Sequence, residues 1–138
     1  MGNVNLLAVV AGAAAFFIVG ALWYTVLFGK AWRVETGFTD EVIAAGPKPG
    51  QNPTWLIFGL CFAFEMLVSL MLGHNIARSN PAPHVIMMMA VGFGATIMVP
   101  AIGINYLYQG KSGKLFAIDA GHFIFGTAAM GAAHILLG

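Results

Sequence analysis

Four long stretches of apolar residues, separated by short polar segments, organise the chain. They cover approximately residues 4–28, 54–77, 84–108 and 115–137, and the only charged side chains within them are Glu65 and Asp119. At about 1.5 Å per residue, each stretch is long enough to cross a hydrocarbon core of roughly 30 Å as a helix. The pattern predicts an all-α integral membrane bundle of four transmembrane helices, forming one domain over residues 1–138.

Composition supports a membrane location and excludes other classes. Hydrophobic residues make up 59% of the chain and charged residues 8%, whereas soluble domains carry about 25% charged residues. Strands are excluded because open strand edges cannot be satisfied in lipid and the short alternating segments of a barrel are absent. A net charge of +1 without a basic cluster argues against nucleic acid as a partner. The expected surroundings are the lipid bilayer and other membrane protein subunits.

The distribution of basic residues predicts the orientation. Arg78 is the one basic residue in the connection between the second and third stretches, and the other five lie in the first and third connections: Lys30, Arg33, Lys48, Lys111 and Lys114. Because lysine and arginine concentrate in cytoplasmic loops, residues 29–53 are predicted to form a cytoplasmic loop. Both termini are then expected on the non-cytoplasmic side of the membrane.

The segment GALWYTVLFGKAW, residues 20–32, is typical of a helix leaving a bilayer. Trp23, Tyr24 and Trp32 are amphipathic aromatics suited to headgroup depth, and Lys30 suits the aqueous side. An interfacial anchor is the preferred interpretation, and a functional role for Trp23 or Tyr24 is the alternative. In the loop that follows, Thr39 is expected to cap a short helix that begins at Asp40 and stops at Gly46 and Pro47.

The first and third stretches share a weak similarity. YTVLFGKAW and INYLYQGKSGKLF both place aromatics before a Gly-Lys pair at the predicted cytoplasmic face. A parallel internal repeat would produce this similarity, and so would two helices that leave the same interface, which is the preferred explanation.

The segment from Gly20 to Trp32, with GF in the third stretch and an Asn-aromatic exit into a short basic loop, resembles a family of small bacterial membrane proteins, the domain of unknown function numbered 1761. The resemblance covers nearly the whole chain and implies a bacterial four-helix membrane protein. It implies no activity and no functional residues beyond the motif itself.

Glu65 is the most costly residue in the second stretch, because an acidic side chain near mid-membrane costs roughly 3 kcal/mol on insertion scales. Cys61 and Ser69 lie on its helix face, so Glu65 is expected to point into the bundle. Two interpretations stay open: a proton or cation site, and a protonated acid hydrogen-bonded to a neighbouring helix.

A second polar group is predicted at the cytoplasmic end of the bundle. Asn105 lies near the end of the third stretch, Asp119 lies near the start of the fourth, and His122 shares the face of Asp119. Gly126, Ala129 and Ala133 continue that face as a stripe of small residues that allows close helix packing. A hydrogen-bonded lock between helices is preferred over a proton relay, since no nucleophile or oxyanion site accompanies these residues.

His74, His84 and His134 lie near the outer ends of three stretches. Metal, haem or pigment binding by these histidines is a weak alternative, because their spacing matches no metal motif. Pro100 is expected to bend the third helix.

These observations favour a non-enzymatic structural or accessory subunit of a membrane assembly or homo-oligomer, without cofactor. A small proton-coupled transporter or channel using Glu65 is the alternative.

Overall fold

The computed structural model describes residues 2–46, 48 and 50–138, which form helices and contain no strand. Four helical spans are long and apolar enough to cross a membrane: Leu6–Leu27, Thr54–Ser79, Pro83–Gln109 and Gly113–Leu137. The first comprises α1 (Leu6–Leu22) and the π-helical segment η1 (Trp23–Leu27), the second is α4 and the fourth is α7. The third comprises α5 (Pro83–Gly92), the π-helical segment η2 (Phe93–Met98) and α6 (Val99–Gln109). The predicted all-α fold is confirmed, with four helical spans long and apolar enough to cross a membrane.

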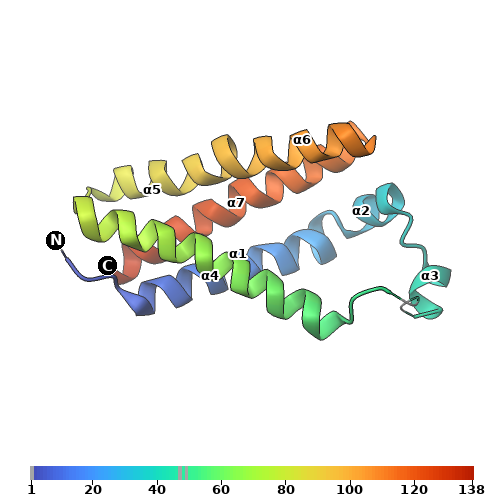
Figure 1. Cartoon of the computed structure of the whole chain (residues 1–138), viewed down its shortest axis with the longest axis horizontal. Coiled ribbons are helices and arrows are strands. Elements are labelled where there is room, and N and C mark those ends of the chain that lie inside the picture. Colours follow the sequence, from blue (N-terminus) through green and yellow to red (C-terminus); the bar gives the residue numbers. More distant parts are fainter. Residues whose placement is uncertain (1, 47, 49) are drawn as a thin grey trace.

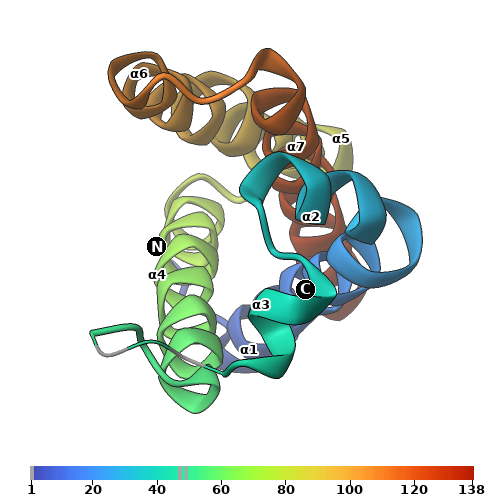
Figure 2. The same cartoon turned by 90° about the vertical axis from the view of Figure 1, so that its right-hand side faces the viewer.

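The four spans form an open arc (Figures 1 and 2). α1 packs between α4 and α7, and α7 packs between α1 and the third span, whereas α4 has only limited contact with the third span, near α5. As a result, 33% of the most apolar part of the first and fourth spans is buried, against 17% for the second and third. The second and third spans are therefore the outer members of the arc.

Side chains from all four spans meet in the core. Phe16, Leu72, Ala90 and Met130 form one buried cluster, with one residue from each span. Glycines bring the helices close together: a Cβ on Gly126 would lie 2.9 Å from the Phe16 ring, and one on Gly131 would lie 2.7 Å from the Ala90 Cβ. The predicted small-residue face of the fourth helix is confirmed at Gly126.

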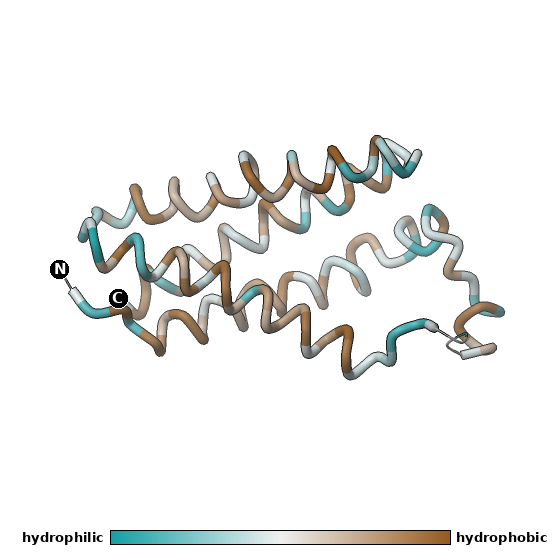
Figure 3. The backbone as a smooth tube through the Cα atoms, in the orientation of Figure 1, coloured by the Kyte–Doolittle hydropathy of each residue, from teal (hydrophilic) through white to brown (hydrophobic). Residues whose placement is uncertain are grey.

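The two ends of the bundle differ. At one end, here called the termini end, the Asn5 side-chain amide donates to the Leu137 carbonyl at 2.8 Å and the Gly2 N–H donates to the Ala77 carbonyl at 3.0 Å. The opposite end, here called the basic end, carries Lys30, Arg33, Lys111 and Lys114. Figure 3 shows hydrophobic colour along the spans and hydrophilic colour gathered toward both ends.

Both π-helical segments contain a threonine that bonds to its own helix. The Thr25 hydroxyl donates to the Ala21 carbonyl in the first span, and the Thr96 hydroxyl donates to the Gly92 carbonyl in the third. Such bonds compete with the regular backbone ladder and often bend helices. Pro100, which donates no backbone hydrogen bond, lies two residues after the end of η2. The wider helical turn of η2 therefore ends just before the residue at which the sequence predicts a bend.

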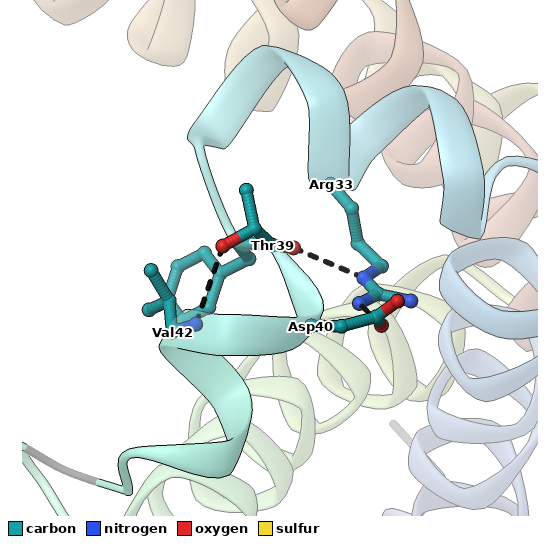
Figure 4. A network of polar contacts seen from close by, with 5 residues as sticks. Arg33, Thr39, Asp40 and Val42 are labelled. Carbon is teal, nitrogen blue, oxygen red and sulfur yellow. Dashed lines mark hydrogen bonds and ion pairs between the residues drawn. The ribbon is translucent and has the colours of Figure 1, made fainter.

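Two short helices follow the first span at the basic end. α2 (Gly29–Thr36) begins after a break at Phe28 and ends at Gly37, whose φ of 75° is left-handed. α3 (Asp40–Ala44) starts as predicted, since the Thr39 hydroxyl accepts from the Val42 N–H at 3.2 Å (Figure 4). Phe38 stacks on Trp32 with a centroid distance of 5.4 Å. The predicted stop at Pro47 lies outside the described residues.

Candidate functional site at the basic end

Asp119 is the centre of a polar site between three spans. It lies in the second turn of α7 and is 6% exposed. The Tyr24 hydroxyl of η1 donates to its Oδ1, and the Tyr106 hydroxyl of α6 donates to its Oδ2. One carboxyl group therefore joins the first, third and fourth spans.

Asp119 has no basic partner among the described residues. Among the described residues the one ion pair within 4.0 Å is that of Arg33 with Asp40 in the loop (Figure 4). A buried carboxylate without a cation is costly, and hydrogen bonds to both of its oxygens are what reduce that cost. The two phenol hydroxyls are the only side-chain groups seen to supply such bonds to Asp119 within the described part of the chain.

His122 lies one turn beyond Asp119 on α7. Its ring contacts Tyr24 and Phe16 edge to face, with centroid distances of 5.0 and 5.2 Å. Its Nε2 is buried and has no hydrogen-bond partner among the described residues. Gly20 makes room for this ring, since a Cβ at Gly20 would lie 2.8 Å from Nε2. As predicted, Asp119 and His122 share one face of α7, and both contact Tyr24. They do not form a hydrogen bond with each other.

Asn105 does not belong to this site. It is exposed, and among the described residues no side-chain hydrogen bond involves it. The adjacent Tyr106 occupies the position against α7 that was expected of Asn105. The expectation was based on depth in the membrane, which neighbours share, whereas adjacent residues in a helix point about 100° apart.

Trp23 also differs from its prediction as an interfacial anchor. It is buried, its indole N–H donates to the Ile118 carbonyl at 2.9 Å, and its ring lies on Gly121. A tryptophan inside a helix interface needs such an acceptor. Lys30 is exposed as expected, and Trp32 packs edge to face on Tyr24 at 5.7 Å.

Tyr106 was not identified from the sequence as a site residue. For Tyr24, an interfacial anchor was preferred over a functional role. The signal for both was the similarity between YTVLFGKAW and INYLYQGKSGKLF, which places a tyrosine before Gly-Lys in each span. Buried tyrosine hydroxyls usually find a partner, and Asp119 is the carboxyl group at that depth.

Glu65 lies apart from this site, on α4. It is half-buried, and its Oε2 is buried without a hydrogen-bond partner in the described part of the chain. Along the predicted stripe, Ser69 is fully buried whereas Cys61 is exposed. Side chains of this stripe become more exposed from Ser69 to Cys61, because α4 diverges from the other spans toward the basic end.

Ser69 and His134 form a second polar cluster, near the termini end. The Ser69 hydroxyl donates to the Val9 carbonyl at 2.7 Å and lies 2.9 Å from His134 Nε2. A serine has one hydrogen to donate, so Nε2 carries the proton that joins the two side chains. In this pattern His134 does not act as a base toward Ser69. The cluster instead links α1, α4 and α7 by hydrogen bonds.

The three histidines considered for metal, haem or pigment binding do not converge. His74 and His84 are exposed and His134 is buried. Within residues 2–46, 48 and 50–138, no group of three or more His, Cys, Asp or Glu side chains is placed to hold a metal ion. That interpretation of His74, His84 and His134 as one site is therefore wrong.

Comparison with known proteins identifies the family. The family described as "Protein of unknown function (DUF1761)" matches residues 7–135, and the chain belongs to it. No curated protein and no solved structure matches the chain.

Proposed function

We propose that this member of the DUF1761 family is a non-enzymatic subunit of a bacterial inner-membrane assembly, formed with its own copies or with other membrane proteins. The observation that carries the proposal is the open arc of spans, in which α4 and the third span each pack along one neighbour. Between them runs an apolar groove of about 280 Å³, lined by Leu67, Val68, Met71, Phe93, Ile97 and Met98.

Glu65 lies one turn from Val68 on α4, on the basic side of this groove. Its buried Oε2 has no partner among the described residues. Polar side chains hydrogen-bond across membrane helices, so a helix that docks along the groove is in place to supply the missing bond. An apolar groove beside an unpartnered carboxyl group favours protein over lipid as its cover.

Cysteine cross-linking in native membranes tests the assembly. In a Cys61→Ala background, Leu67→Cys and Ile97→Cys place thiols at the groove, on side chains that are 62% and 61% exposed. Both are expected to form intermolecular disulfides on mild oxidation. Ile18→Cys, at a 58% exposed position on α1, is the matched control and is expected to form few.

Mass measurement of the purified protein in mild detergent gives the second readout. The proposal predicts a complex larger than one chain. A stable monomer without companion subunits, together with equal cross-linking at Leu67, Ile97 and Ile18, would overturn it.

A small proton-coupled transporter or channel is the second candidate, and the buried, unpartnered Glu65 Oε2 favours it. Glu65→Gln removes the titratable proton and retains shape and hydrogen-bonding capacity. If Glu65 carries protons, this variant loses proton flux in liposomes while its expression is unchanged. Glu41→Gln, in the exposed loop helix α3, is the control. Equal flux by Glu65→Gln and the unmodified chain would leave Glu65 only a packing role.

A further inference from the structure

No cationic side chain pairs with Asp119 among the described residues, and its side-chain partners are the Tyr24 and Tyr106 hydroxyls. The elements packed against α7 at the basic end are η1, α2, η2 and α6. Apart from Asp119, the titratable or charged groups of these elements, of α7 itself and of the short connection before it are Tyr24, Lys30, Arg33, Glu35, Tyr106, Tyr108, Lys111, Lys114, His122 and His134; His134 lies near the termini end, bonded to Ser69. Arg33 pairs with Asp40, Glu35 accepts from Ser112, and Lys30, Lys111 and Lys114 are exposed.

The hydrogen bonds at Asp119 match the ionised form of its carboxyl group. An ionised carboxylate only accepts, and here each oxygen accepts one phenol O–H. When a proton binds to one oxygen, that oxygen becomes a donor. The phenol that pointed its hydrogen at it must then turn or leave.

The two tyrosines are held with unequal strength. Tyr24 is packed edge to face against both Trp32 and His122, at 5.7 and 5.0 Å. Tyr106 has one aromatic contact, with Phe116 at 6.5 Å, and α6 contains no buried residue. Tyr106 is therefore the partner that separates more easily, and its hydrogen bond to Asp119 is the side-chain bond that ties α6 to α7.

The site lies close to water at the basic end. Asp119 is the seventh residue of α7, about 9 Å along the helix from its first residue. A cavity of about 230 Å³ opens beside Tyr106 and is lined also by Gly103, Lys111, Ser112 and Phe116. A hydronium ion at this end has a short path to the Oδ2 atom to which Tyr106 donates.

We propose that Asp119 is a proton-binding site, and that proton uptake releases Tyr106 and with it α6 from α7. The proton comes from water at the basic end and forms an O–H bond on Oδ2. The Tyr106 hydrogen bond is the one that breaks, and the Tyr24 bond to Oδ1 is retained. η2 and Pro100, at the start of α6, provide the irregular turn about which α6 moves. This inference does not depend on the proposed assembly.

Infrared difference spectroscopy of the full chain in lipid nanodiscs tests the proton site. Acidification is expected to produce C=O bands from several protonated carboxylic acids, and one of them, the Asp119 band, is expected to be absent from Asp119→Asn. Glu65→Gln is the matched control, because it removes the other carboxyl group within the spans and is expected to retain the Asp119 band. Tyr106→Phe, which keeps the ring and removes one donor, is expected to shift the pH at which the band appears upward.

Spin-label distances test the movement. In a Cys61→Ala background, labels at Tyr108→Cys on α6 and Ala117→Cys on α7 occupy exposed positions at the basic end, on either side of the bond between Tyr106 and Asp119. Acidification is expected to lengthen and broaden this distance in the otherwise unmodified chain. With Asp119→Asn the distance is expected to be independent of pH.

Two results would overturn the proposal. One is the same set of acid-induced C=O bands in Asp119→Asn as in the unmodified chain. The other is an unchanged Tyr108–Ala117 distance across the pH range in which the Asp119 band appears. If Asp119→Asn does not fold, the Tyr106→Phe variant provides the test. If the Asp119 band appears at the same pH in Tyr106→Phe as in the unmodified chain, Tyr106 does not affect proton binding and the proposal is overturned.

Discussion

Gly94 lies where the third span crosses α7, at one of the closest approaches between helices. A Cβ built on it would lie 2.8 Å from the Phe123 carbonyl oxygen and 3.3 Å from the Ile124 Cα, which are backbone atoms that cannot rotate away. Two residues earlier in the same span, a Cβ on Gly92 would meet nothing within 4 Å. The two glycines are therefore a matched pair.

Gly94→Ala is expected to destabilise the protein by about 1–3 kcal/mol, because overpacking forces the helices apart. Gly92→Ala is expected to be neutral or to stabilise by up to about 1 kcal/mol, since alanine favours helix more than glycine does. Thermal unfolding in detergent, followed by circular dichroism, measures both. Equal midpoints for the two variants would mean that the helices are not in close contact at Gly94.

Ser69 gives a second prediction at this scale. Ser69→Ala leaves the Val9 carbonyl and the His134 Nε2–H without the partner that they share, and an unsatisfied buried polar group costs about 1–3 kcal/mol. Ser79→Ala is the control, because Ser79 is exposed and its side-chain bond among the described residues is to the Asn75 carbonyl of its own helix. A loss of stability no larger for Ser69→Ala than for Ser79→Ala would contradict the role given to the cluster.

The membrane depth of the polar residues could be predicted from the sequence better than their direction. Asp119 and His122 lie on α7, a regular helix, and the i, i+3 rule placed both on one face, which in the structure lies against Tyr24. Asn105 and Trp23 were misjudged because both were placed by their depth near the end of a span. Depth does not determine which way a side chain points, since adjacent residues in a helix point about 100° apart.

At the scale of elements, the four spans were predicted to within about two residues at most ends, because hydropathy over some 20 residues is a strong signal. α2 was not predicted. Its eight residues, GKAWRVET, are too few and too mixed in polarity to show a periodic pattern. The π-helical segments depend on bonds from Thr25 and Thr96 to their own helices, and threonine is too common in membrane helices to indicate them.

α6 is the span segment expected to open most readily. It has no buried residue, whereas α5 in the same span buries Ile86 and Ala90. Segments with few buried contacts open locally at lower free energy. Hydrogen exchange in nanodiscs, read by mass spectrometry, is expected to show faster exchange in residues 101–109 than in residues 86–92. Comparable protection of the two segments would mean that α6 is held by more than Tyr106.

The two ends of the whole molecule are predicted to face opposite sides of the membrane. Five of the six basic residues precede α4 or lie between α6 and the start of α7, so the basic end is predicted to face the cytoplasm. In a Cys61→Ala background, Gly138→Cys is expected to react with an impermeant maleimide added from outside. Lys48→Cys is expected to react only after permeabilisation. The reverse labelling pattern would mean that the topology is opposite to the predicted one.

The hydrogen bond between Asn5 and Leu137 has a consequence for how the chain order can be changed. Because residues at the two ends of the described chain lie side by side, a short Gly-Ser linker would join them, and the chain could be reopened between α3 and α4. Such a circular permutant would begin with the present second span and end with α3, with both new ends at the basic end. Lysines and arginines rather than the order of spans set orientation. The permutant is therefore expected to insert with its basic end on the same side of the membrane as in the original chain. Its first helix would then cross the membrane in the opposite direction to the original first helix.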